Sequence, residues 1–146
     1  MTKIRLQKAT LNNWKLVEKL EKNAKGQFFC PCKGETEYKN YIKTSNVFLI
    51  MANEIPIGTI SYKIKSKTAL INGLTLLPQY RGQGIATNTM KKILTKLKNK
   101  NIELVVHPQN TPAIIIYLHL GFKIMGWKEN YFGNGQPRLL LKKLKV

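Results

Sequence analysis

A glycine-rich turn between a strand and a helix is the part of the sequence best suited to chemistry. It reads Arg-Gly-Gln-Gly-Ile-Ala over residues 81–86 and follows a strand that ends at Pro78. The first turn of a helix leaves about four backbone N–H groups unpaired and carries about half a positive charge. Because glycine has no side chain, a phosphate can approach these N–H groups closely. The turn therefore predicts an anion-binding site.

A simpler interpretation is that the two glycines only close a tight turn. The P-loop sequence Gly-x-x-x-x-Gly-Lys-Ser/Thr is absent, and Gly82 and Gly84 without a third glycine form a poor dinucleotide-binding fingerprint. The turn alone therefore does not identify the ligand.

A second segment adds a tyrosine at a helical position. Residues 110–122 read N-T-P-A-I-I-I-Y-L-H-L-G-F, with Pro112 at the start of a helix and Gly121 just past its end. Tyr117 lies on the apolar face that also carries Leu120, so we expect a partly buried ring whose hydroxyl needs a partner. A core tyrosine with no chemical role is the alternative.

Together the two segments resemble the GNAT (Gcn5-related N-acetyltransferase) family. Residues 81–86 fit its Arg/Gln-x-x-Gly-x-Gly/Ala motif, and residues 110–122 fit its Asn-x-x-Ala-x-x-x-Tyr-x-x-x-Gly-Phe helix, in the family's order. The ending, residues 130–138, resembles the family's carboxy-terminal strands. The resemblance covers essentially the whole chain, most weakly from Gln27 to Ser45. It implies an acyl-CoA-dependent enzyme that transfers the acetyl group of acetyl-CoA to a primary amine.

The resemblance also implies roles for individual residues. Amides at the helix start would hold the CoA pyrophosphate beside Arg81, and the end of the preceding strand would bind the pantetheine arm, with the amide nearest Leu76 as oxyanion donor. Asn110 would contact the pantetheine or open its helix, and Tyr117 would protonate the departing CoA thiolate as general acid. The implied acetyl-CoA-binding residues are Leu74, Thr75, Leu76, Arg81, Gly82, Gln83, Gly84, Ile85, Ala86, Thr87, Asn110 and Tyr117.

The general base is harder to assign. An acceptor amine must lose a proton before it attacks, because a lysine side chain has a pKa of about 10.4 and an α-amine one of about 8. Asn72 stands where the fourth strand of many relatives carries a glutamate, and an amide cannot take up that proton. Glu103 ranks first and His107, at the end of the same strand, second as possible bases. A solvated strand-end residue is the competing interpretation for each.

Hydrophobic periodicity predicts the elements that would position these groups. Their order, β-α-α-β-β-β-α-β-α-β-β, indicates a mixed α/β (α+β) fold in one domain over residues 1–146. The resemblance adds a mostly antiparallel sheet of about seven strands, splayed between strands four and five, with about four helices. Strands are expected over 3–9, 47–52, 59–64, 68–77, 102–106, 122–127 and 138–144, helices over 11–20 after Thr10, 35–43, 84–98 and 112–120 after Thr111, a loop over 27–34 and a turn over 53–58.

The composition is strongly basic, with 25 Lys and Arg against 7 acidic residues and a formal net charge of +18. Such a field attracts an acidic partner such as RNA or an acidic protein. However, the lysines are spread along the chain, so a compositional bias toward Lys, Ile and Asn explains them equally well. A polycationic acceptor such as a polyamine would be repelled.

Other features narrow the class of protein. No apolar run reaches the ~20 residues of a membrane span, and the first residues lack a signal-peptide pattern, so we expect a cytoplasmic protein with no membrane partner. Cys30 and Cys32 are too few for a disulfide framework, and His107 and His119 do not complete a zinc site with them. We expect no metal and no covalent cysteine intermediate.

The expected function is direct acetyl transfer in a ternary complex to a protein or peptide amine, by a monomer or homodimer. An amine on RNA or on a small molecule is the alternative acceptor. Residues 28–32 and a helix with Tyr38 and Tyr41 fall where the family builds its acceptor pocket, although burial against the sheet explains these aromatic residues equally well. The alternative from another class is a non-catalytic GNAT module that binds CoA or RNA. It stays open because Asn72 stands where many relatives carry a glutamate.

Overall fold

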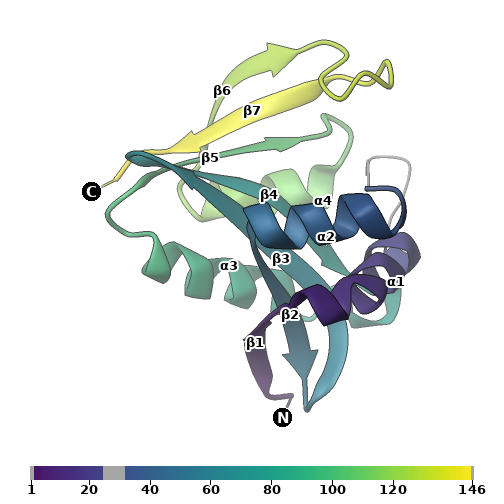
Figure 1. Ribbon diagram of the computed structural model, residues 1–146. Coiled ribbons are helices and arrows are strands. Elements are labelled where there is room, and N and C mark those ends of the chain that lie inside the picture. The colour runs from purple at the N-terminus through teal and green to yellow at the C-terminus, as the bar shows by residue number, and fades with distance from the viewer. Residues whose placement is uncertain (1, 25–31, 146) are drawn as a thin grey trace. The chain divides into compact units, whose positions relative to one another are not determined.

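The computed structural model describes residues 2–24 and 32–145, and its helices and strands follow the order expected from the sequence (Figure 1). None of the described helices is long and apolar enough to cross a membrane. The expected loop over 27–34 lies mostly outside the described residues. The elements are β1 Ile4–Lys8, α1 Trp14–Ala24, α2 Gly34–Thr44, β2 Asn46–Ala52, β3 Ile55–Lys65, β4 Thr68–Leu76, α3 Ile85–Lys96, β5 Asn101–Val106, α4 Thr111–His119, β6 Lys123–Lys128 and β7 Arg138–Lys143, with 3₁₀ helices at Leu11–Asn13 and Pro78–Tyr80.

The seven strands are ordered β1-β2-β3-β4-β5-β7-β6. Neighbours β1–β2, β2–β3, β5–β7 and β6–β7 are antiparallel, and β4–β5 is parallel, which confirms the mixed sheet. β4 pairs with β5 over Thr68–Ile71, opposite Asn101–Leu104. In the described chain this pairing does not continue past Ile71, although β4 runs on to Leu76. The main-chain groups at the end of β4 are therefore not used by β5.

The chain forms two compact units. The first contains Met1–Lys63 and Asn72–Lys92, and so holds β1, β2, β3, α1, α2, the end of β4 and most of α3. The second contains Ile64–Ile71 and Ile93–Val146, and so holds the start of β4, the end of α3, β5, α4, β6 and β7.

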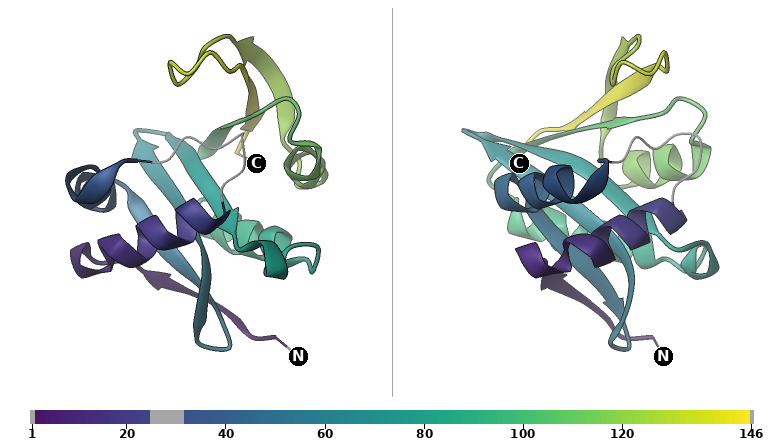
Figure 2. Two further views of the ribbon diagram at one scale, coloured as in Figure 1. Left: turned by 90° about the vertical axis from the view of Figure 1, so that its right-hand side faces the viewer. Right: turned by 45° about the vertical axis from the view of Figure 1, so that its right-hand side comes forward.

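The core of the first unit lies between the α1–α2 pair and β2. The two helices contact each other and lie side by side (Figure 2). Val17 and Leu20 on α1 are buried as their spacing predicts, whereas Leu11, which we expected on the same stripe, is exposed because it lies in the preceding 3₁₀ helix. The buried cluster is Ala9, Val17, Leu20, Tyr38, Ile42, Val47, Leu49 and Met51.

Two helix starts differ from the expected ones. Thr10 precedes the 3₁₀ helix, and its backbone N–H donates to the Asn13 side chain at 2.9 Å, so α1 begins only at Trp14. The expectation that Thr111 caps α4 is wrong, because Asn110 holds the cap position. Pro112 fits the first turn of α4 because its missing N–H would be unpaired there anyway.

The β2–β3 hairpin is tighter than expected. Asn53 and Glu54 have φ angles of 48° and 69°, so two residues in the left-handed region complete the turn, and β3 begins at Ile55 instead of Thr59. The strand accommodates Pro56 because the register shifts beside it, which is typical of a β-bulge.

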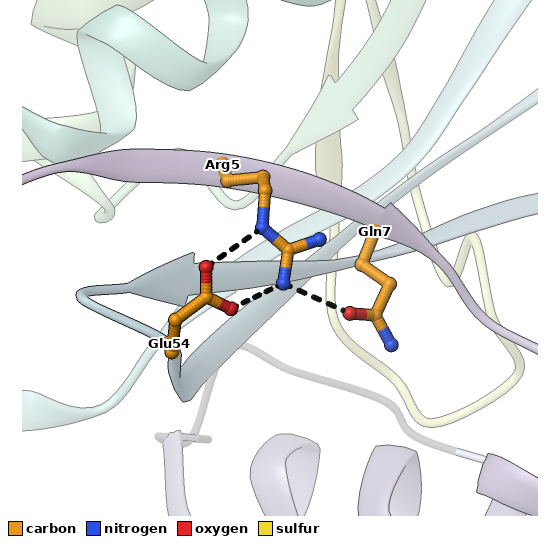
Figure 3. Close-up of polar contacts among 3 residues, drawn as sticks. All are labelled: Arg5, Gln7 and Glu54. Atoms are coloured by element: carbon orange, nitrogen blue, oxygen red, sulfur yellow. Dashed lines mark hydrogen bonds and ion pairs between the residues drawn. The ribbon is translucent and has the colours of Figure 1, made fainter.

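An ion pair joins β1 to this turn. The Arg5 guanidinium binds the Glu54 carboxylate, with Nε 3.2 Å from Oε1, and donates to the Gln7 side chain at 3.1 Å (Figure 3). Arg5 lowers the pKa of Glu54. Because both side chains are exposed, solvent screens the pair and its contribution to stability is small.

Gly58 lets β3 approach the end of β4 closely. A Cβ atom on Gly58 would lie 2.1 Å from the carbonyl oxygen of Thr75 and 3.1 Å from the Cα of Leu76. These are main-chain atoms, so they cannot move aside without distorting β4. Just beyond, the Leu77 N–H donates to the Ile57 carbonyl at 2.8 Å. Gly58 therefore sets the position of the strand end that we expect to bind pantetheine.

We predict that Gly58→Ala lowers the free energy of unfolding by about 2–3 kcal/mol, because the added methyl group forces the strands apart. Urea denaturation measures this. Gly73→Ala is the matched control on β4, because its Cβ would meet nothing within 4 Å. It should change stability by no more than about 0.5 kcal/mol. Equal losses in the two variants would contradict the close approach.

Candidate active site

The turn before α3 has a shape that favours glycine. Gly82 and Gly84 have φ angles of 74° and 80°, in the region that other residues rarely adopt. A Cβ atom at either position would meet no atom within 4 Å, so the space beside the turn is open. The glycines therefore both close the turn and leave its outer side accessible.

The amides at the start of α3 are unpaired in the described part of the chain. The first to find an acceptor is that of Asn88, which donates to the Gly84 carbonyl at 3.0 Å. Among residues 2–24 and 32–145, no acceptor pairs with the N–H groups of residues 82–87, and the first turn of α3 contains no acidic residue. These groups, together with the positive end of the helix dipole, fit a diphosphate.

Arg81 connects this turn to the end of β4. Its Nε donates to the carbonyl oxygen of Leu76 at 3.2 Å. The guanidinium is therefore held where strand and turn meet, and it adds a fixed positive charge beside the unpaired amides.

Two polar contacts involve the second half of β4. The Asn72 amide lies 3.5 Å from the hydroxyl of Ser45, which follows α2, and Thr75 contacts Thr59, which binds Glu21 of α1. Ala69, Ile71 and Thr75 are buried, whereas Asn72 is exposed. Thr75 therefore lies on the buried side of the strand.

Tyr117 lies in the second unit, on α4. Its side chain is buried, and its ring packs edge-on against Phe122 with 5.8 Å between ring centroids. Burial raises the pKa of Tyr117 to about 12. The hydroxyl therefore keeps its proton at neutral pH, as a general acid must.

The residues predicted as bases also lie in the second unit. Glu103 is partly exposed and pairs with Lys142 on β7, with Oε2 4.0 Å from Nζ. His107 is buried, its Nδ1 accepts the Gln109 N–H at 3.1 Å, and its Nε2 lies 2.8 Å from the Gln136 side-chain oxygen. Nε2 is then the protonated nitrogen. Either residue would have to break these contacts to accept a proton from an amine.

Asn110 holds the cap position of α4, as one of its two expected roles requires. Its carbonyl accepts the Ile114 N–H at 3.1 Å, and its own N–H donates to the His107 carbonyl at 2.9 Å. Its side chain makes no capping hydrogen bond.

A buried carboxylate in the first unit was not predicted from the sequence. Glu21 on α1 is only 4% exposed, and its Oε2 accepts a hydrogen bond from the Thr59 hydroxyl at 3.0 Å. Burial raises the pKa of Glu21 to about 7, and the nearby hydroxyls of Thr59 and Tyr38 lower it only in part. The sequence signal was present: Glu21 follows Val17 by four residues and so lies on the apolar stripe of α1.

This pKa predicts how stability varies with pH. Between its ordinary pKa of 4.5 and about 7, Glu21 keeps its proton in the native state and loses it in the unfolded state. Its stabilising contribution is therefore complete below pH 4.5 and lost above pH 7. We predict that the unfolding free energy of the wild type, relative to Glu21→Gln, falls by about 3 kcal/mol between pH 4 and pH 8. Denaturation series across pH measure this, and parallel curves would contradict the buried carboxylate.

A mixed sheet in which β4 leads through an open glycine turn into α3 agrees with the GNAT-like fold expected from the sequence. A profile described as the acetyltransferase (GNAT) family matches residues 14–122. The chain therefore belongs to the GNAT family, whose acetyltransferases use acetyl-CoA.

Individual relatives agree with this. An N-alpha-acetyltransferase of Saccharolobus solfataricus is 32% identical over 72 residues, which are 47% of this chain and 43% of that protein. A spermidine N(1)-acetyltransferase of Escherichia coli K12 is 36% identical over 70 residues, 44% of this chain and 38% of that protein. The chain thus matches less than half the length of either relative.

A solved structure shares the fold across nearly the whole chain. It is a ribosomal L7/L12 alpha-N-protein acetyltransferase in complex with coenzyme A, with a TM-score of 0.83 and 15% sequence identity. The alignment covers 99% of this chain and 96% of that one. The expected GNAT-like fold is therefore confirmed.

Proposed function

We propose that this chain is an N-acetyltransferase that transfers the acetyl group of acetyl-CoA to a primary amine of a protein or peptide, by direct attack in a ternary complex. One observation carries the proposal: the start of α3 is open, lined by glycine and bears unpaired amides directly after the end of β4. Membership of the GNAT family supports it.

The first unit supplies most of the proposed binding groups. The amides of Gln83, Gly84, Ile85, Ala86 and Thr87 bind the pyrophosphate, and Arg81 adds positive charge beside them. The strand end Leu74–Leu76, which β5 does not use, hydrogen-bonds the pantetheine arm as a neighbouring strand would.

Three kinds of group then promote the reaction. Acetyl-CoA supplies an activated thioester when bound. An amide near Leu76 stabilises negative charge on the reacting carbonyl oxygen, a role that contributes ~3 kcal/mol in comparable sites. Tyr117 gives its proton to the departing thiolate. Glu103 and His107 remain candidates for the base, and each would give up its present contact, with Lys142 or with Gln136, when it takes up a proton.

The net charge of the protein indicates which class of amine it accepts. At a formal +18, the protein repels a polycation such as spermidine, although one relative is named for that substrate. A peptide α-amine carries a single charge, and another relative is named as an N-alpha-acetyltransferase. We therefore favour a peptide or protein amine in the cytoplasm, with an RNA-linked amine second because the same charge attracts RNA.

An amine panel tests this proposal. Peptides with a free α-amine, a peptide with a blocked amino terminus and one lysine, and spermidine are each incubated with acetyl-CoA, and released CoA thiol is measured. We expect the highest kcat/KM for a free α-amine. Binding of acetyl-CoA without acetylation of any amine would instead indicate a non-catalytic module.

Charge reversal at the turn tests the diphosphate site. We predict that Gln83→Glu raises the Kd for acetyl-CoA about tenfold, because a carboxylate near the amides repels phosphate. Stability should be unchanged or slightly higher, since a negative charge suits a helix start. Asn12→Asp, an exposed position before α1, is the matched control and should leave the Kd unchanged. Calorimetric titration measures both, and an unchanged Kd in Gln83→Glu would contradict the site.

Removal of the Tyr117 hydroxyl tests the general acid. We predict that Tyr117→Phe lowers kcat about a hundredfold, the lower end of the range for general acid catalysis, because a thiolate leaves readily even without a proton. The Kd for acetyl-CoA should stay within about twofold. Tyr131→Phe, an exposed tyrosine in the same unit, is the control. Steady-state kinetics decide, and an undiminished kcat would refute the role.

A further inference from the structure

Three buried polar side chains in the first unit form a continuous hydrogen-bonded row. Glu21 from α1, Thr59 from β3 and Thr75 from β4 are 4%, 2% and 9% exposed. Glu21 Oε2 lies 3.0 Å from Thr59 Oγ1, which lies 2.9 Å from Thr75 Oγ1. The row therefore runs from a carboxylate under α1 to the strand end that we assign to the pantetheine arm.

The hydrogen atoms in this row have a fixed direction. A threonine hydroxyl has one hydrogen to donate, and that of Thr59 goes to the Glu21 carboxylate. The contact between the threonines must then be donated by Thr75. The Thr75 oxygen is left with acceptor capacity, so a proton that arrives there can be passed along the row.

We propose that Glu21 is the final proton acceptor for acetyl transfer, and that Thr75 and Thr59 carry the proton to it from the acceptor's ammonium group. This inference rests on the proposed function. An ammonium N–H bond breaks as the proton binds Thr75, the Thr75 hydrogen passes to Thr59, and the Thr59 hydrogen passes to Glu21. The products are a neutral amine, whose lone pair attacks the thioester, and a neutral carboxylic acid.

Charges around Glu21 favour this role. From α1, Glu18 faces the same cluster and pairs with Lys22 at 3.6 Å. From α2 and the residues before it come Tyr38, Tyr41 and Cys32, and burial raises the pKa of both tyrosines well above their usual value. Within the described residues no lysine or arginine pairs with Glu21. The carboxylate therefore keeps a high affinity for a proton.

Substitutions along the row test the proposal, with acetyl-CoA and an alanine-initiated peptide as substrates. Glu21→Gln can accept the Thr59 hydrogen bond but cannot take up a proton. We expect kcat/KM at pH 7 to fall about tenfold in Glu21→Gln and Thr75→Val, because only about a tenth of an α-amine with a pKa of about 8 is neutral at that pH. The wild-type rise in kcat/KM near pH 7 should be lost, and rates should approach the wild type near pH 9, where the amine is already neutral. A purely structural role would not produce this recovery.

Conservative variants separate proton transfer from packing. Thr75→Ser and Thr59→Ser restore a hydroxyl and should recover most of the activity lost in the corresponding valine variants. Ser61→Ala is the matched control, because Ser61 is buried on the same strand and bonds Tyr41 outside the row. Its pH profile should match the wild type.

An NMR titration of the glutamate side chains needs no turnover, so it tests the proposal even if a variant is too poorly folded to be active. All 7 acidic residues of the chain are glutamates, so ¹³C-carboxyl glutamate labelling reports every acidic side chain. We expect one resonance to titrate near pH 7 and to vanish in Glu21→Gln. A Glu21 resonance that titrates near 4.5, the ordinary pKa, would overturn the proposal.

Failure of the row and failure of the proposed function give different results. An active wild type with an unchanged pH profile in Glu21→Gln overturns the row alone. A wild type that binds acetyl-CoA but acetylates no amine overturns the proposed function, and the row as its proton acceptor with it.

Discussion

The unpaired amides at the start of α3 are the constraint on which the rest of the structure depends. A helix cannot satisfy its first N–H groups internally, and here no other described group satisfies them. Gly82 and Gly84 have no side chains that could cover these groups, and the space beside them is open. Their positive φ angles disfavour any other residue at these positions. The chain thus keeps exposed polar groups where a diphosphate can pair with them.

The end of β4 connects this site to the buried chemistry of the first unit. Arg81 bonds the carbonyl of Leu76, and Thr75 bonds Thr59 beneath α1. Gly58 lets β3 lie close against the same residues. Main-chain groups that β5 does not use and the hydroxyl row toward Glu21 therefore lie on the same strand end.

Local patterns predicted most of the fold and part of the site. Glycine spacing located the turn before α3, and Pro112 with Gly121 located α4, because these residues act on the backbone nearby. The start of β3 was missed because Asn53 and Glu54 can adopt left-handed backbone without glycine. Thr111 was mistaken for a cap because it and its neighbour Asn110 are both good capping residues.

Glu21 was missed for a different reason. Its unusual pKa arises from burial under α1 and from contacts with β3 and β4, which are distant in the sequence. Tertiary packing alone creates that environment. In the same way, the contacts of Glu103 with Lys142 and of His107 with Gln136 depend on β7 and the residues before it, not on β5 alone.

Amide resonances of ¹⁵N-labelled protein during an acetyl-CoA titration test the central claim most directly. The account predicts large shifts for residues 82–87, because their N–H groups acquire phosphate acceptors, with smaller shifts at the end of β4. Unchanged resonances at 82–87 in protein that binds acetyl-CoA would contradict it.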